Sequence, residues 1–244
     1  MQQIKLFRYF CISIVLVINS LNLNAQTTKI AIVSLEDTTL VHQHVGLTAF
    51  ANFTDTLQFK LATSKYIEKQ LKKYLSSKYS ASIVQLPEYA VNGKKELFDF
   101  WGGMNKNIKN WLISSKDQYD LVIFINNIQI PREMNILVQK NTSGVYSRWN
   151  MIGFYTTITF SVYRTADLKN LEYYNLGGKV ISPQKDFKLP GDKKTFTPEM
   201  IEVLKAGFKK HLDSRIEHFL TNTYLIAPDQ LEMIKTETTG NLLP

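Results

Sequence analysis

Two histidines separated by a single residue are the side chains in this sequence whose type and spacing best suit chemistry. In His42-Gln43-His44 both imidazoles would lie on one face of a β-strand, because successive strand side chains point to opposite faces. Imidazoles held together in this way can bind Zn²⁺, so His42 and His44 are the candidate metal ligands. His211 and His218 share one face of a predicted helix and could complete a four-ligand site. Alternatively, the second pair consists of half-buried residues beside an apolar stripe.

A second group of candidates combines aromatic and cationic side chains. Tyr146, Arg148 and Trp149 lie in residues 141–155, a segment with two glycines that is predicted to be a loop. Tryptophan and arginine most often dominate the binding energy of protein interfaces. These three residues are therefore candidate binding residues. The alternative is a hairpin tip whose aromatic side chains fold onto the sheet.

Asn126 and Asn127 are the third candidates, because they follow the unbroken apolar run Leu121–Ile125. Open α/β sheets bind ligands beyond the carboxyl ends of their parallel strands, so the two amides could line a polar cleft. Alternatively, they satisfy backbone groups where the strand bends.

Catalytic motifs are absent from the sequence. It contains no Gly-x-Ser-x-Gly nucleophile turn, and its glycine pairs lack the spacing and the lysine of a phosphate-binding loop. No pair of carboxylates is placed at strand ends as glycoside chemistry would need. The sequence therefore favours a protein that is not an enzyme and needs no cofactor.

The elements that must position these residues follow a clear order around one strand. The run Leu121–Ile125 contains three β-branched residues and predicts a central strand, residues 119–130, that is covered on both faces. Other predicted strands are 29–35, 81–86, 135–140, 154–163 and 171–181, and predicted helices are 55–77 with Asp55 as N-cap, 94–115, and one beginning after Thr197. The order β-α-β-α-β-β-β-β-α predicts an α/β fold with one mixed sheet and helices packed on it. Residues 36–56 have no sustained period and predict a long ordered loop.

The N-terminus has the pattern of an export signal. Lys5 and Arg8 precede an apolar run at 10–18, and Ala25 supplies a small residue at a cleavage site. Residues 1–25 are therefore expected to be cleaved, leaving one domain over 26–228 and a weakly ordered tail over 229–244. The only cysteine, Cys11, lies inside the apolar run, so lipidation is not expected and the mature chain has no thiol. Export without disulfides fits a periplasmic or secreted bacterial protein.

The charge balance points to anionic partners. The full chain has 29 basic and 21 acidic residues and a net charge of +8, which falls to +6 when Lys5 and Arg8 leave with the signal. This modest charge suits an anionic envelope polymer or an envelope protein rather than nucleic acid. No transmembrane segment is expected in the mature chain, and the sequence does not indicate the oligomeric state.

The order of the predicted elements begins with the strand Lys29-Ile30-Ala31-Ile32-Val33 and includes the later strand Tyr119-Asp120-Leu121-Val122-Ile123. This order resembles that of small exported α/β domains of bacterial envelopes. Examples are the amino-terminal domain of TolB and the curli-secretion and penicillin-binding-protein-activator lipoproteins. The resemblance implies a binding scaffold rather than a catalyst, and it carries over no individual site residue. The expected function is therefore a non-catalytic exported scaffold that binds an envelope protein or polymer. The alternatives are a small-molecule or metal-binding protein that uses residues 36–56, and a hydrolase with an unrecognised site.

Overall fold

A computed structural model describes residues 27–35, 38–46, 52–57, 61–91, 97, 104–127, 142–148, 151–175 and 196–240. The described elements are β1 (Lys29–Ser34), β2 (Thr39–Val45), β3 (Phe53–Thr56), α2 (Thr63–Leu75), β4 (Ser80–Ile83), α3 (Glu88–Val91), α4 (Lys106–Ser114), β5 (Leu121–Asn127), β6 (Thr142–Arg148), β7 (Met151–Thr156), β8 (Ile158–Arg164), β9 (Asn170–Asn175), α5 (Pro198–Asn222) and α6 (Pro228–Gly240). No helix in these ranges is long and apolar enough to cross a membrane.

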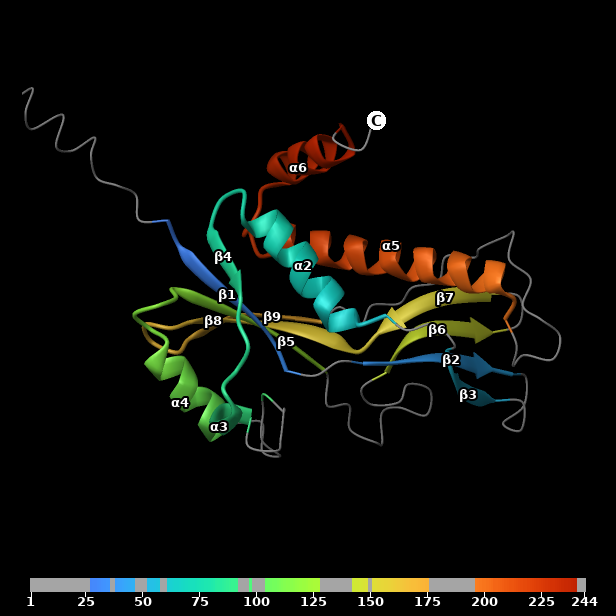
Figure 1. Cartoon of the computed structure of the whole chain (residues 1–244), viewed down its shortest axis with the longest axis horizontal. Coiled ribbons are helices and arrows are strands. Elements are labelled where there is room, and N and C mark those ends of the chain that lie inside the picture. Colours follow the sequence, from blue (N-terminus) through green and yellow to red (C-terminus); the bar gives the residue numbers. More distant parts are fainter. Residues whose placement is uncertain are drawn as a thin grey trace, which may run out of the picture.

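Sheet A has the strand order β4-β1-β5-β8-β9. Strands β4, β1 and β5 are parallel, whereas β8 and β9 are antiparallel to their neighbours. The helix between β1 and β4, α2, packs on one face of this sheet, and the helices between β4 and β5, α3 and α4, lie on the other face (Figure 1). The predicted α/β class, with parallel strands first and antiparallel strands after them, is confirmed.

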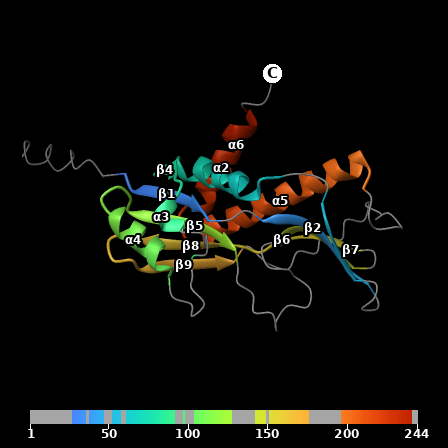
Figure 2. The same cartoon turned by 60° about the horizontal axis from the view of Figure 1, so that its bottom comes forward.

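Sheet B has the strand order β3-β2-β6-β7. It extends sheet A along the direction of the strands, and three strand positions correspond in the two sheets: β2 lies beyond β1, β6 beyond β5 and β7 beyond β8 (Figure 2). Strand β2 follows β1 and pairs with β6 in parallel, as β1 pairs with β5. Strand β7 passes into β8 through the single residue Thr157. At the junction the Leu35 N–H donates to the Ile125 carbonyl at 3.0 Å, and the Thr157 N–H donates to the Thr142 carbonyl at 3.3 Å. The predicted single sheet is therefore divided into two.

Strand β5 is the centre of the molecule, as the sequence predicted. Ile123 and Ile125 are fully buried in the core that α2 and α5 cover, whereas Val122 and Phe124 are fully buried in the core that α4 covers. Side chains alternate between the two faces of a strand, so one apolar run fills both cores. The ring of Trp111 on α4 contacts Phe124 edge-on, with the ring centres 6.1 Å apart.

Helix α5 spans both sheets on the α2 side (Figure 1). Its start was predicted correctly, because the Thr197 hydroxyl accepts a hydrogen bond from the Met200 N–H at 3.3 Å and Pro198 is the first helical residue. Where α5 crosses β7, a Cβ at Gly207 would lie 2.5 Å from the Phe154 ring. Glycine therefore permits the close approach of this helix to sheet B.

The prediction of a loop over residues 36–56 was wrong, because the described residues of this range include β2 and β3. Its alternation of inward and outward side chains is hidden in the sequence, since several inward residues are polar. Asp55 lies within β3 and is not an N-cap, and the helix predicted over 55–77 begins only at Thr63.

The second half contains further differences. The described residues of 141–155, a range predicted to be a loop, lie in β6 and β7. The predicted strand 154–163 is interrupted at Thr157. The expected weakly ordered tail after Asp229 instead begins with α6, which buries Leu231 against the main core. The second half of the helix predicted over 94–115 is confirmed as α4, whereas residues 94–96 and 98–103 lie outside the described residues, as does the predicted strand 135–140.

Candidate functional site

The two strand histidines converge on one serine hydroxyl. His42 and His44 lie on the same face of β2, as predicted, and both are buried. The Ser147 Oγ on β6 lies 2.8 Å from the His42 Nε2 and 2.8 Å from the His44 Nδ1. A hydroxyl has one proton to donate, so it can donate to one imidazole while it accepts from the N–H of the other. The tautomers of the two histidines are therefore coupled through Ser147.

Aromatic rings enclose this histidine–serine cluster of His42, His44 and Ser147. The Phe53 ring stacks on His44 at a centroid distance of 5.0 Å and meets His42 edge-on at 5.1 Å. The Phe196 ring lies 5.3 Å from His42. Burial, together with the charge of His44, lowers the pKa of His42 to about 4, although the Asp55 charge acts in the opposite direction. His42 is therefore neutral near pH 7.

Asp55 gives the cluster a partial likeness to a nucleophile–base–carboxylate arrangement. It lies directly opposite His42 in the β2–β3 pair. The His42 Nδ1 and the Asp55 Oδ2 are both buried, and neither has a hydrogen-bond partner within the described ranges. Ser147, however, is fully buried, so a substrate carbonyl does not reach its Oγ in this conformation. In this state the cluster joins β2 and β6 by polar contacts.

The predicted four-histidine site does not assemble. His211 and His218 both lie on α5, where His211 stacks on the Phe154 ring and His218 contacts Tyr174. Among the residues that the structure describes, no three His, Cys, Asp or Glu side chains form a group that could hold a metal ion. Metal binding by His42 and His44 alone stays a prediction.

The predicted asparagine pair lies at the junction of the two sheets. The Asn127 Oδ1 accepts a hydrogen bond from the Thr157 hydroxyl at 3.3 Å, and Asn126 is buried. Sheet B continues past the carboxyl ends of β1 and β5, so strands occupy the place where an open α/β sheet would have its ligand crevice. The Asn126 Oδ1 and the Asn127 Nδ2 are buried and have no hydrogen-bond partner among the described residues, so these amides do not satisfy backbone groups there, and a role in ligand binding stays a prediction.

The predicted aromatic and cationic candidates are only partly described. Tyr146 is half-buried on β6 and faces away from Ser147, because adjacent strand residues alternate. Arg148 is the last residue of β6, and Trp149 lies outside the described residues. Their role in binding stays a prediction.

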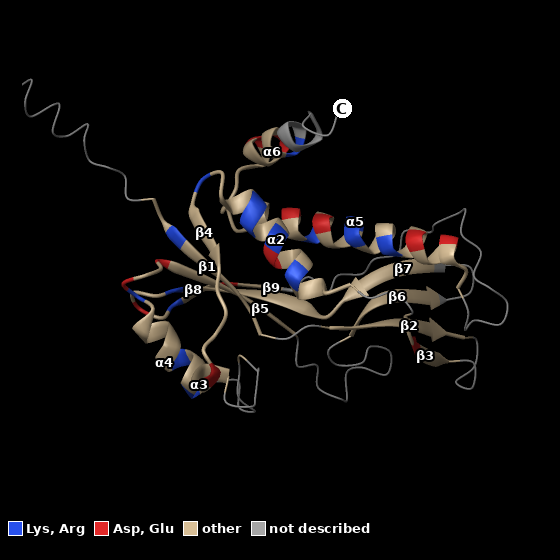
Figure 3. Ribbon diagram, in the orientation of Figure 1, with Lys and Arg blue, Asp and Glu red and all other residues tan. Residues whose placement is uncertain are grey.

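A lysine face on α2 is the surface feature that sequence reasoning did not single out. Residues 63–78 contain five lysines and one glutamate. The exposed lysines at helical spacing, here called the lysine face, are Lys65, Lys69, Lys72 and Lys73. Figure 3 shows that the charged positions of α2 are mostly basic, with the acidic Glu68 among them, whereas the neighbouring α5 carries both signs along its length. The spacing was visible in the sequence but is equally typical of any solvated helix face.

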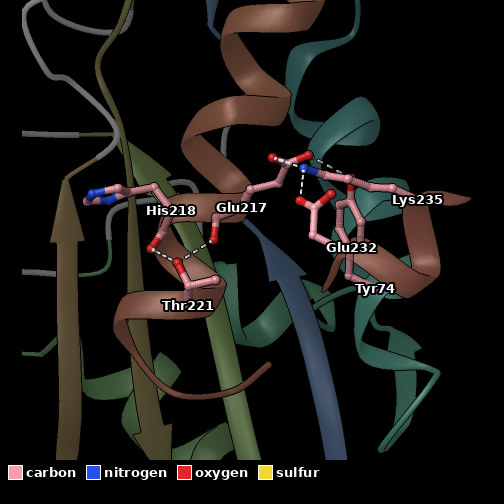
Figure 4. A network of polar contacts seen from close by, with 6 residues as sticks. All are labelled: Tyr74, Glu217, His218, Thr221, Glu232 and Lys235. Carbon is pink, nitrogen blue, oxygen red and sulfur yellow. Dashed lines mark hydrogen bonds and ion pairs between the residues drawn. The ribbon is translucent and has the colours of Figure 1, made fainter. Parts of the chain in front are cut away.

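The carboxylates between α2 and α5 contact other groups and do not pair with Lys65, Lys69 or Lys72, although the charge of Asp213 acts on Lys73. The Tyr66 hydroxyl donates to Asp213 at 2.8 Å. The Glu217 carboxylate accepts a hydrogen bond from the Tyr74 hydroxyl at 3.2 Å and pairs with the Lys235 ammonium at 2.8 Å (Figure 4).

These contacts attach α2 to α5 and α6 and leave Lys65, Lys69 and Lys72 outside the network. Within the described part of the chain, Lys65, Lys69 and Lys72 form no ion pair. The positive charge of α2 is therefore presented outward on a helix that is fixed in place.

Comparison of the chain with protein families, with curated proteins and with solved structures finds no match.

Proposed function

We propose that the protein is an exported, non-catalytic scaffold of a bacterial cell envelope that binds an anionic envelope polymer through the lysine face of α2. The observation that carries this proposal is the group of four exposed lysines at 65, 69, 72 and 73 on one side of a single helix. Export is supported by the basic, apolar and small residues of 1–25.

The lysine face has the geometry of a polyanion-binding surface. Residues four apart on a helix rise by about 6 Å, so Lys65, Lys69 and Lys73 form a row that can follow a chain of negative charges. The helix below the row is anchored by Ile67 and Leu71, which are fully buried. A charged row on an anchored helix loses little backbone freedom on binding, and this favours affinity.

Binding to a polyanion tests the proposal. The triple variant Lys65→Gln, Lys69→Gln, Lys72→Gln should bind long-chain polyphosphate about 10- to 100-fold more weakly at low salt, because each lysine near an anionic surface contributes roughly 1 kcal/mol. The matched control replaces the exposed Lys106, Lys109 and Lys116 on and just after α4, on the opposite side of sheet A. This control removes the same charge and should bind within about twofold of wild type. Equal losses in both variants would show that net charge alone drives binding.

Export is tested separately. N-terminal sequencing of the protein from its native host should give a chain that begins near Gln26. An intact Met1 on the majority of the protein contradicts this part of the proposal.

A further inference from the structure

Tyr224, just after the end of α5, combines backbone strain with exposure. Its φ is +55°, in the left-handed region, and 88% of the residue is exposed. Helices commonly place glycine at this position, since other residues lose roughly 1 kcal/mol or more there. The ring does not recover this loss by burial. Strain that packing does not offset is a feature of binding sites.

A cation lies close to the backbone that follows Tyr224. The carbonyl of Leu225, the residue after Tyr224, accepts hydrogen bonds from the Lys78 ammonium at 3.4 Å and from the Tyr79 hydroxyl at 2.9 Å. Lys78 is exposed and follows the C-terminal end of α2. The same ammonium lies over the Tyr79 ring, 5.1 Å from its centre. Tyr224 and Lys78 are therefore brought into one region of the surface, through the Leu225 backbone, where the lysine face ends.

We propose that Tyr224 and Lys78 bind one sugar unit of an acidic polysaccharide whose chain continues along the lysine face. The inference rests on the proposed function and names the class of polymer. The π face of a tyrosine is negative and attracts the C–H groups on the flat side of a sugar ring. The lysine ammonium pairs with the carboxylate of a uronic acid. Polyphosphate has no such C–H face, so the tyrosine ring adds nothing to its binding.

Removing the ring separates binding from folding. Tyr224→Gly in the full mature chain should raise the melting temperature, because glycine adopts a positive φ without strain. The same change should weaken binding of oligogalacturonate about tenfold, as expected for the loss of one stacked ring. Affinity for polyphosphate should stay within about twofold of wild type. Tyr224→Phe keeps the ring and should keep oligogalacturonate binding, whereas Lys78→Gln should weaken the binding of both polymers.

The results that overturn the proposal are specific. A lower melting temperature for Tyr224→Gly would show that the ring stabilises the fold. Unchanged affinity for oligogalacturonate, or equal losses on both polymers, would show that the ring does not contact a sugar. A larger loss on single-stranded DNA than on oligogalacturonate would assign the ring to base stacking. If the wild type binds neither polyphosphate nor oligogalacturonate, the proposed function itself fails, which is a different result.

Discussion

Sheet A and sheet B share three strand positions but differ in what their strands bury. In sheet A the residues of β5 that face α2 and α5 are apolar and fully buried, such as Ile123 and Ile125. In sheet B the strand positions on the same side contain His42, His44 and Ser147, which are also buried. We therefore expect sheet B to depend more than sheet A on the hydrogen-bond partners and the neutral state of its buried polar groups.

The largest effect is expected at the centre of sheet A. Phe124→Ala removes a fully buried ring that contacts Trp111 and Tyr163, and it should lower the free energy of unfolding by about 3–5 kcal/mol. Urea unfolding measures this loss. A loss below about 1 kcal/mol would show that β5 is peripheral and would remove the contrast between the sheets.

Acid should destabilise sheet B before sheet A. Burial lowers the pKa of both His42 and His211 to about 4 in the folded protein, from 6.5 in the unfolded chain, with smaller contributions from His44 and Arg215 respectively. The stabilisation from each neutral imidazole is fully present above pH 6.5 and is lost as the pH falls towards 4. Each histidine contributes up to roughly 3 kcal/mol to this change.

Hydrogen exchange at pH 7 and at pH 4.5 tests this expectation. The amides of β2 and β6 should lose protection at pH 4.5, while those of β1 and β5 keep it. Simultaneous loss of protection in both sheets would mean that the two halves unfold as one unit.

A pair of buried serines gives the sharpest comparison of the two sheets. Ser147→Ala in sheet B removes the hydroxyl that both imidazoles contact, and it should lower the free energy of unfolding by about 1–3 kcal/mol. Ser161→Ala in sheet A removes a buried hydroxyl with no hydrogen-bond partner among the described residues, so it should be neutral or stabilising. Thermal and urea melts compare the two variants. Equal effects would contradict the assigned difference between the sheets.

The same difference explains which parts of the fold were predictable from the sequence. The run Leu121–Ile125 predicts a buried strand because every residue in it is apolar, and Thr197-Pro198 predicts a helix start because both residues suit that position. In β2 the inward side chains include histidines, so hydrophobic periodicity gives no strand signal. The meeting of His42 and Ser147 depends on a pairing between residues 105 apart in the chain, which local patterns do not contain.

The surface features were harder to predict for another reason. The lysines of α2 were visible as the polar side of a helix, but only the packed structure shows that Asp213 and Glu217 are bound by other groups. The exposure of Tyr224 depends on how α5 ends, and no sequence pattern here indicates a left-handed tyrosine. The short apolar spacing after Pro228 likewise gave too weak a signal for α6.

The salt dependence of polyphosphate binding tests the lysine face most directly. The slope of the logarithm of affinity against the logarithm of salt concentration reports how many counterions binding releases, at about 0.7–0.9 per neutralised charge on a nucleic acid. The variant lacking Lys65, Lys69 and Lys72 should show a slope about 2 shallower than wild type, and the variant lacking Lys106, Lys109 and Lys116 should show the wild-type slope. Equal slopes for the two variants would contradict the claim that α2 is the binding surface.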